Sequence, residues 1–150
     1  MLRKLSTQLN IVSTFESSTK KPLVFLALIV LAGLFLRLVY FPYDIPIVAD
    51  GQGYFWYAID MSVLNQLPTE YPVHNTGWPS FLSIIFQFMD SNHFLDYHNV
   101  QRIVGVVFSL ATIFPVYFLC SRYFKKSYSL LGATLFVVEP RLIQNSFLGT

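Results

Sequence analysis

Three long hydrophobic runs divide the chain. The first, residues 22–43, is apolar for roughly 19–20 residues, close to the roughly 20 that an α-helix needs to cross a 30 Å hydrocarbon core. The second, residues 101–121, includes an uncharged stretch from Ile103 to Cys120. The third, residues 128–145, carries two ionisable side chains near its far end. We therefore expect three transmembrane helices.

The segment between the first two runs, residues 44–100, is predicted to contain shorter amphipathic helices. Tyr54 and Met61 follow Asp50 by four and eleven residues, so a helix that begins here would place all three on one face. A second apolar stretch, Trp78–Met89, is too short to cross a bilayer and is typical of an interfacial or re-entrant helix.

The distribution of charge predicts the orientation of these helices. Lys and Arg are absent between Leu38 and Gln101, an interval that holds six of the eight acidic residues, whereas the tail (residues 1–21) and the turn at residues 122–127 are basic. Because positively charged segments stay on the cytoplasmic side, both are predicted to be cytoplasmic and residues 44–100 extracytoplasmic. The predicted fold is an all-α membrane protein with three transmembrane helices, a cytoplasmic N-terminus and a long external loop with interfacial helices. We expect the tail to be partly disordered or to lie on the membrane.

Composition agrees with an integral, multi-pass protein of the cell membrane or endoplasmic reticulum. The chain is 54% hydrophobic and 12% charged, against about 45–50% and 25% in soluble domains. A single cysteine, Cys120, excludes an intramolecular disulfide, and a net charge of +2 without a basic run gives no indication of nucleic acid as a partner. Cleavage of the first run as a signal peptide is not expected, because its exit is bulky.

Asp50 is an isolated acid placed where the chain leaves the first hydrophobic run. Aspartate before glycine is a common N-cap or turn residue, and on sequence alone that structural interpretation is favoured. The alternative is a carboxylate held at the membrane surface for chemistry.

Three cationic residues and a second acid lie in or beside the hydrophobic runs. Glu139 is either a functional group inside the third crossing, with Arg141 nearby, or an already hydrated residue where the helix ends early at a proline. Arg37 and Arg102 either snorkel towards the lipid headgroups or bind phosphate oxygens.

Other chemistry has weaker sequence support. His74 lies in the external loop near Trp78, and a lone loop histidine is usually solvated. His93 and His98 lack the i, i+4 spacing of a zinc helix, so no metal site is predicted.

Four segments of the chain, taken in sequence order, resemble the N-terminal part of the GT-C glycosyltransferases. The likeness is greatest to the branch of dolichyl-phosphate-mannose protein mannosyltransferases and lipid A aminoarabinose transferases. The resemblance covers residues 22–150, with Gly51 where the family often has Glu and a single Pro79 where it has two prolines. The segments that carry it are "ADGQGYFWYA", "HNTGWPSFLSIIFQF", "NVQRIVGVVFSLATIFPVYFL" and "GATLFVVEPRLIQNSFLGT".

The resemblance implies an inverting hexosyl- or pentosyltransferase that moves a sugar from a polyprenyl-phosphate donor to a protein or lipid acceptor on the extracytoplasmic side. Asp50 would be the catalytic general base and Glu139 a stand-in for the family's second acid. Arg residues would stabilise the leaving phosphate, and aromatic or histidine side chains would contact the substrate. The substrate-binding residues implied in this way are Tyr54, Arg37, His74, Trp78, Arg102 and Arg141.

The same resemblance implies that the chain is a fragment of a longer GT-C-like domain. It assigns no definite cofactor and leaves a divalent metal open. Two alternatives remain: an oligosaccharyltransferase-like catalytic subunit, disfavoured because its paired-acid motif is missing, and a non-catalytic three-pass assembly or transporter subunit.

Overall fold

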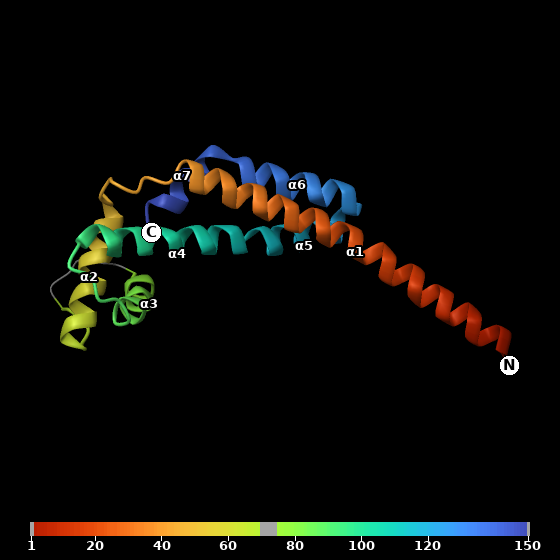
Figure 1. The fold of residues 1–150 in the computed structure, drawn as a ribbon, viewed down its shortest axis with the longest axis horizontal. Coiled ribbons are helices and arrows are strands. Elements are labelled where there is room, and N and C mark those ends of the chain that lie inside the picture. Colours follow the sequence, from red (N-terminus) through yellow and green to blue (C-terminus); the bar gives the residue numbers. More distant parts are fainter. Residues whose placement is uncertain (1, 70–74, 150) are drawn as a thin grey trace. The chain divides into compact units, whose positions relative to one another are not determined.

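In the computed structural model, every regular element of the described residues, 2–69 and 75–149 with side chains from residue 21 onward, is a helix (Figure 1). The all-α prediction is therefore confirmed for this part of the chain. The helices are α1 (Leu2–Val39), α2 (Asp50–Leu64), α3 (Gly77–Phe86), α4 (Phe94–Ala111), α5 (Ile113–Tyr123), α6 (Lys126–Val138) and α7 (Pro140–Phe147).

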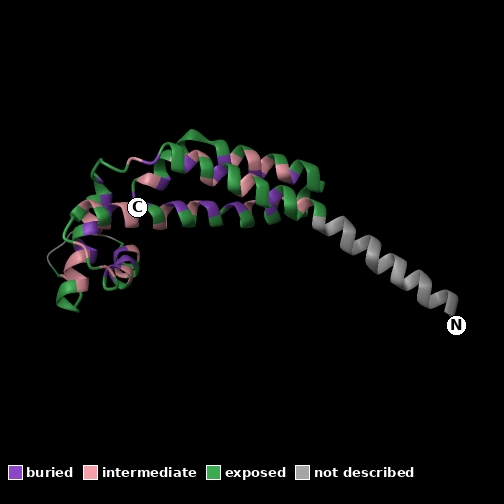
Figure 2. Cartoon of the chain, in the orientation of Figure 1, coloured by how far each residue is buried: buried purple, intermediate pink, exposed green. Residues whose placement is uncertain are grey.

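Two helical stretches are long and apolar enough to cross a membrane. They are Lys21–Val39, within α1, and Phe94–Tyr123, which comprises α4 and α5. In each stretch, only 22% of the 18 most apolar consecutive residues are buried. Most of its apolar surface therefore faces outward, unlike that of a core helix in a soluble protein. Figure 2 shows exposed residues recurring along both stretches. This finding supports a membrane location.

The predicted third crossing, residues 128–145, is not one helix. α6 ends at Val138 after 13 residues, which span about 20 Å at 1.5 Å per residue. Glu139 has an extended backbone (φ −61°, ψ 117°) because the ring of Pro140 disfavours the α conformation in the preceding residue. A new helix, α7, begins at the proline itself.

Two further boundaries differ from the prediction. α1 begins at Leu2 and continues past Pro22, so the expected partial disorder of the tail is wrong. The alternative, that the tail lies on the membrane, stays a prediction. The helix that contains the second hydrophobic run begins at Phe94, earlier than predicted, and is interrupted at Thr112, between α4 and α5. Pro115 explains the interruption, because it has no N–H to donate to the carbonyl of Ala111.

The chain divides into two compact units, Met1–Leu36 with Leu110–Glu139, and Arg37–Ser109 with Pro140–Thr150. In the first unit, α5 and α6 pack against each other, joined by the predicted short basic turn. A Cβ added at Gly132 would lie 3.3 Å from Cys120 Sγ, so a small residue permits close contact there.

The second unit is built on α2, α3 and the first part of α4. Its core contains Phe55 and Ala58 of α2 with Leu82 and Phe86 of α3, and Tyr97 of α4 packs against them. Both predicted loop helices are therefore present, and they pack on each other.

Candidate functional site

Asp50 is the first residue of α2, and its side chain is exposed. The N-cap position is occupied by Ala49, so the interpretation of Asp50 as the helix cap is wrong. A carboxylate in the first turn still interacts favourably with the helix dipole, typically by about 0.3–1 kcal/mol. The position presents a negative charge at the surface of the second unit.

The residue before Asp50 has an unusual backbone conformation. Ala49 has φ 57° and ψ −137°, a region that residues with a Cβ rarely adopt. Such a conformation costs on the order of 1–3 kcal/mol and persists only where the surrounding structure holds it. The Gln52 N–H donates to the Ala49 carbonyl at 3.1 Å and closes the turn.

Gly51 shows how tightly this turn is seated. A Cβ at this position would lie 2.1 Å from the carbonyl oxygen of Leu148 and 2.5 Å from Cγ2 of Ile47. Both are closer than real Cβ contacts, and the first involves backbone that cannot rotate away. The start of α2 therefore lies directly against the segment that follows α7, and only glycine fits.

Three buried polar residues of α4, His98, Gln101 and Arg102, lie on one face of the helix at i, i+3 and i+4, and we call them the α4 clamp. Nε2 of Gln101 donates to the carbonyl oxygens of Gly51 (3.0 Å) and Gly149 (2.7 Å). This one amide joins the Asp50 turn to the segment after α7.

The other two clamp residues hold the chain on either side of that amide. The N–H of Ile47 donates to Nδ1 of His98 at 3.1 Å, which leaves the proton of the neutral ring on Nε2. The Arg102 guanidinium donates to the carbonyls of Pro42 (2.9 Å, from Nη1) and Phe147 (3.2 Å, from Nε). The clamp therefore bonds both the loop before Asp50 and the chain end that packs against it.

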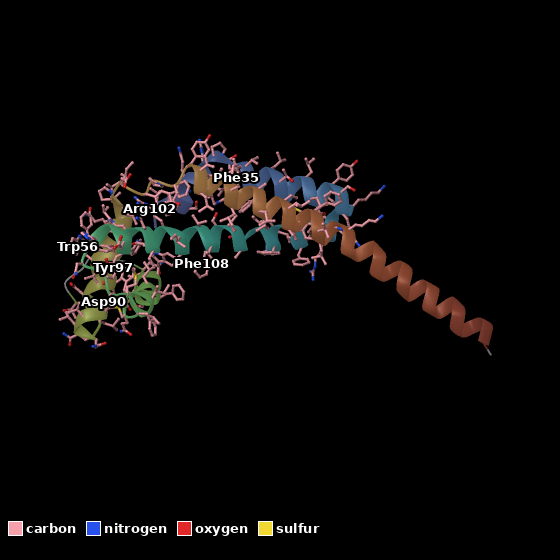
Figure 3. The ribbon with its side chains drawn as sticks, viewed as in Figure 1. Phe35, Trp56, Asp90, Tyr97, Arg102 and Phe108 are labelled. Atoms are coloured by element: carbon pink, nitrogen blue, oxygen red, sulfur yellow. The ribbon has the colours of Figure 1, made fainter. Side chains whose placement is uncertain are left out.

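The two arginines predicted to bind phosphate or to snorkel have their charged groups inside the protein. Arg102 is 3% exposed and Arg37 is 0% exposed, and Nη2 of Arg37 donates to Oγ of Ser109 at 3.0 Å. Neither guanidinium reaches the surface, so snorkelling is wrong for both. Figure 3 shows Arg102 on α4.

The remaining predicted residues occupy varied positions. In the second unit, Tyr54 is half-buried one turn after Asp50, and Arg141 is exposed at the start of α7. Trp78 is half-buried, and its indole Nε1 donates to the Gly149 carbonyl at 2.7 Å. Glu139 is exposed but belongs to the first unit.

The remaining predictions concern His74 and a metal ion. His74 falls in residues 70–74, outside the described part of the chain, so its predicted role stays a prediction. Among the residues that the structure describes, no group of three or more His, Cys, Asp or Glu side chains is placed to hold a metal ion.

Sequence reasoning missed His98 and Gln101. Their signal was the helical spacing of polar residues 98, 101 and 102, where a helix would lead into the uncharged run that begins at Ile103. Polar groups at helical spacing in such a helix must find partners inside the protein. That requirement could have identified the clamp, though not the carbonyls it binds.

The arrangement places an exposed carboxylate on a backbone turn that three clamp residues and a glycine contact hold in one position. A carboxylate in this setting can accept a proton from a hydroxyl or amine that lies within hydrogen-bond distance. It can also bind a cation or a hydrogen-bond donor.

Replacing Gln101 with leucine is expected to destabilise the second unit by roughly 2 kcal/mol, because two hydrogen bonds of about 0.5–1.5 kcal/mol each are lost. Amide hydrogen exchange should accelerate at residues 49–53 and 147–149, measured by mass spectrometry in detergent. Gln87→Leu is the matched control, because Gln87 is exposed and makes only a long bond of 3.4 Å to Asn65. Equal exchange in the two variants would contradict a clamping role for Gln101.

Comparison of the chain with protein-family models, with curated proteins and with solved structures finds no match.

Proposed function

We propose that the chain belongs to a membrane glycosyltransferase that moves a sugar from a polyprenyl-phosphate donor to a hydroxyl or amine of a protein or lipid acceptor. The observation that carries the proposal is the setting of Asp50. Its carboxylate is exposed on a strained turn that the α4 clamp fixes in place. Backbone strain held by surrounding structure is concentrated at functional sites.

In the proposed reaction Asp50 acts as the general base. The acceptor oxygen or nitrogen attacks C1 of the sugar while the Asp50 carboxylate takes its proton. The bond between C1 and the phosphate oxygen breaks with inversion, and polyprenyl phosphate leaves as an anion. Tyr54, one turn along α2, is proposed to contact the sugar.

Of the three arginines expected to stabilise the leaving phosphate, we now assign this role to one. Arg37 and Arg102 bond to protein groups and serve the framework. Arg141 is exposed and belongs to the same unit as Asp50, so we assign the phosphate contact to its guanidinium. Trp78, whose indole N–H is bonded to the Gly149 carbonyl, supports the framework, and its contact with the donor stays part of the proposal.

The proposed orientation follows from charge. Arg122, Lys125 and Lys126, around the α5–α6 turn, are all exposed, and a basic turn between two apolar helices favours the cytoplasmic side. The Asp50 loop, which holds no Lys or Arg, would then face outward. A lipid-linked donor flipped to that leaflet would meet Asp50 at the membrane surface.

The proposal predicts transfer from lipid-linked donors alone. Membranes containing the natural full-length product are incubated with radiolabelled polyprenyl-phosphate mannose, polyprenyl-phosphate aminoarabinose or UDP-glucose, with a Ser/Thr-containing peptide or lipid A as the acceptor. Label should move to an acceptor from at least one polyprenyl-phosphate donor and not from the nucleotide sugar. If the protein is inserted in the membrane and label moves from neither of the two lipid-linked donors, the non-catalytic subunit is favoured.

A further inference from the structure

α3 is apolar on two opposite faces. One face packs on α2 through Leu82 and Phe86. The other carries Phe81 and Ile84, both exposed, and leads to Phe88, which is 86% exposed in the turn that follows the helix. A helix that is apolar all round is normally surrounded by apolar material on every side.

The polar side chains within α3 have hydrogen-bond partners inside the protein. Oγ of Ser80 donates to the Thr76 carbonyl at 2.7 Å, and Oγ of Ser83 donates to the Ser80 carbonyl at 2.8 Å. The indole N–H of Trp78 is bonded to Gly149. The sequence from residue 75 to residue 89 contains no charged residue. These are the properties that a helix requires in order to lie in lipid.

The outer face of α3 is continuous with a membrane-spanning surface. The rings of Phe81 and Phe108 lie 5.7 Å apart and meet edge to face, and both are exposed. Phe108, labelled on α4 in Figure 3, belongs to the span Phe94–Tyr123. It lies five residues after Ile103, where the uncharged run begins, which corresponds to roughly 8 Å of depth along a helix. Interfacial helices insert to about 5–10 Å, so the contact has the depth that such a helix would reach.

The edge of this face is polar but uncharged. An open groove of about 320 Å³ lies between the end of α2 and α3. Leu67 and Ile84 line it together with the amide side chains of Asn65, Gln66 and Gln87. Neutral amides beside aliphatic side chains suit the boundary between headgroups and acyl chains, where hydrogen-bonding groups and hydrocarbon meet.

We propose that the outer face of α3, formed by Phe81, Ile84 and Phe88, is inserted in the lipid bilayer beside α4, with the amide-lined groove at headgroup level. The occupant of this face is lipid rather than protein, because the face runs without interruption into the apolar surface of the span. The inference requires that Phe94–Tyr123 crosses the bilayer and is independent of any enzymatic activity.

Site-directed spin labelling of the full chain tests the proposal. In a Cys120→Ala background, a nitroxide is attached to Ile84→Cys, Phe88→Cys or Asn92→Cys in phosphatidylcholine–phosphatidylglycerol vesicles. Asn92 is the matched control, because it is exposed four residues after Phe88 in a polar loop. Collision rates with oxygen, which partitions into lipid, and with the water-soluble complex Ni-EDDA give a depth parameter at each site. We expect a positive depth parameter at residues 84 and 88 and a negative one at residue 92.

Three results would overturn the proposal. A negative depth parameter at both 84 and 88 would place α3 in water. Low collision rates with both reagents at these two sites would show that a protein partner covers the face. Spin–spin broadening that disappears when labelled chain is diluted with unlabelled chain would identify that partner as a second copy. Both labelled positions are exposed, so the labels should leave the fold intact. If one variant nevertheless fails to fold, the other still measures the depth of this face.

Discussion

Replacing Asp50 with asparagine is expected to lower sugar transfer about 10²- to 10⁴-fold, the range that a positioned general base contributes. The amide has nearly the shape of the carboxylate but cannot take the acceptor's proton. The loss should appear in kcat with little change in KM, because the proton is transferred only in the transition state. Initial rates with the lipid-linked donor and peptide acceptor measure both constants.

The asparagine variant should remain folded and inserted. Its loss of charge at the start of α2 removes only the dipole contribution, about 0.3–1 kcal/mol. Asp44→Asn is the matched control, because Asp44 is exposed in the loop before α2, and it should retain wild-type transfer. Near-normal turnover by Asp50→Asn would remove Asp50 from the proposed mechanism, even if transfer by the wild-type protein were established.

The elements that depend on local sequence were predicted well. Uninterrupted apolar length identified the two stretches that can cross a membrane, and helical spacing after Asp50 identified α2. The short helix predicted over Trp78–Met89 is present as α3, Gly77–Phe86. The turn predicted at residues 122–127 is present but shorter, because α5 continues to Tyr123 and α6 begins at Lys126. Each of these signals is contained within one segment, so the pattern is visible before any tertiary contact is known.

The errors arise where one residue overrides a pattern or where distant segments meet. Hydropathy predicted one helix over residues 128–145, but Pro140 ends α6 inside this apolar run. The alternative interpretation of Glu139, a hydrated residue where the helix ends early at a proline, is the one that agrees with the structure. Asp50 was singled out because it is isolated, but the groups that hold its turn come from α4 and from residues 147–149. Gln101 is 50 residues from Gly51 and 48 from Gly149. A bond over such a separation has no local sequence signal, so the carbonyl groups that the clamp binds could be found only from the structure.

Gly51→Ala is expected to destabilise the second unit by about 3 kcal/mol, the upper part of the range for overpacking. The added methyl group would lie 2.1 Å from the Leu148 carbonyl oxygen, so either the α2 turn or the segment after α7 must move. In a chain of this size the loss corresponds to a fall in melting temperature of roughly 6–12 °C. The melting temperature of the purified protein in detergent, followed by circular dichroism, measures it.

Gly53→Ala, two residues further along α2, is expected to change the stability in the opposite direction. A Cβ at Gly53 meets nothing within 4 Å, and the residue lies inside the same helix. Alanine there should stabilise the protein by about 0.5–1 kcal/mol, because glycine is the poorer helix former. The pair separates the effect of packing from the effect of helix propensity. If both alanines stabilise the protein, the start of α2 is not held against residues 147–149, and the fixed Asp50 turn on which the proposed chemistry rests loses its support. If the signs differ as expected, the turn is held in solution as it is in the structure.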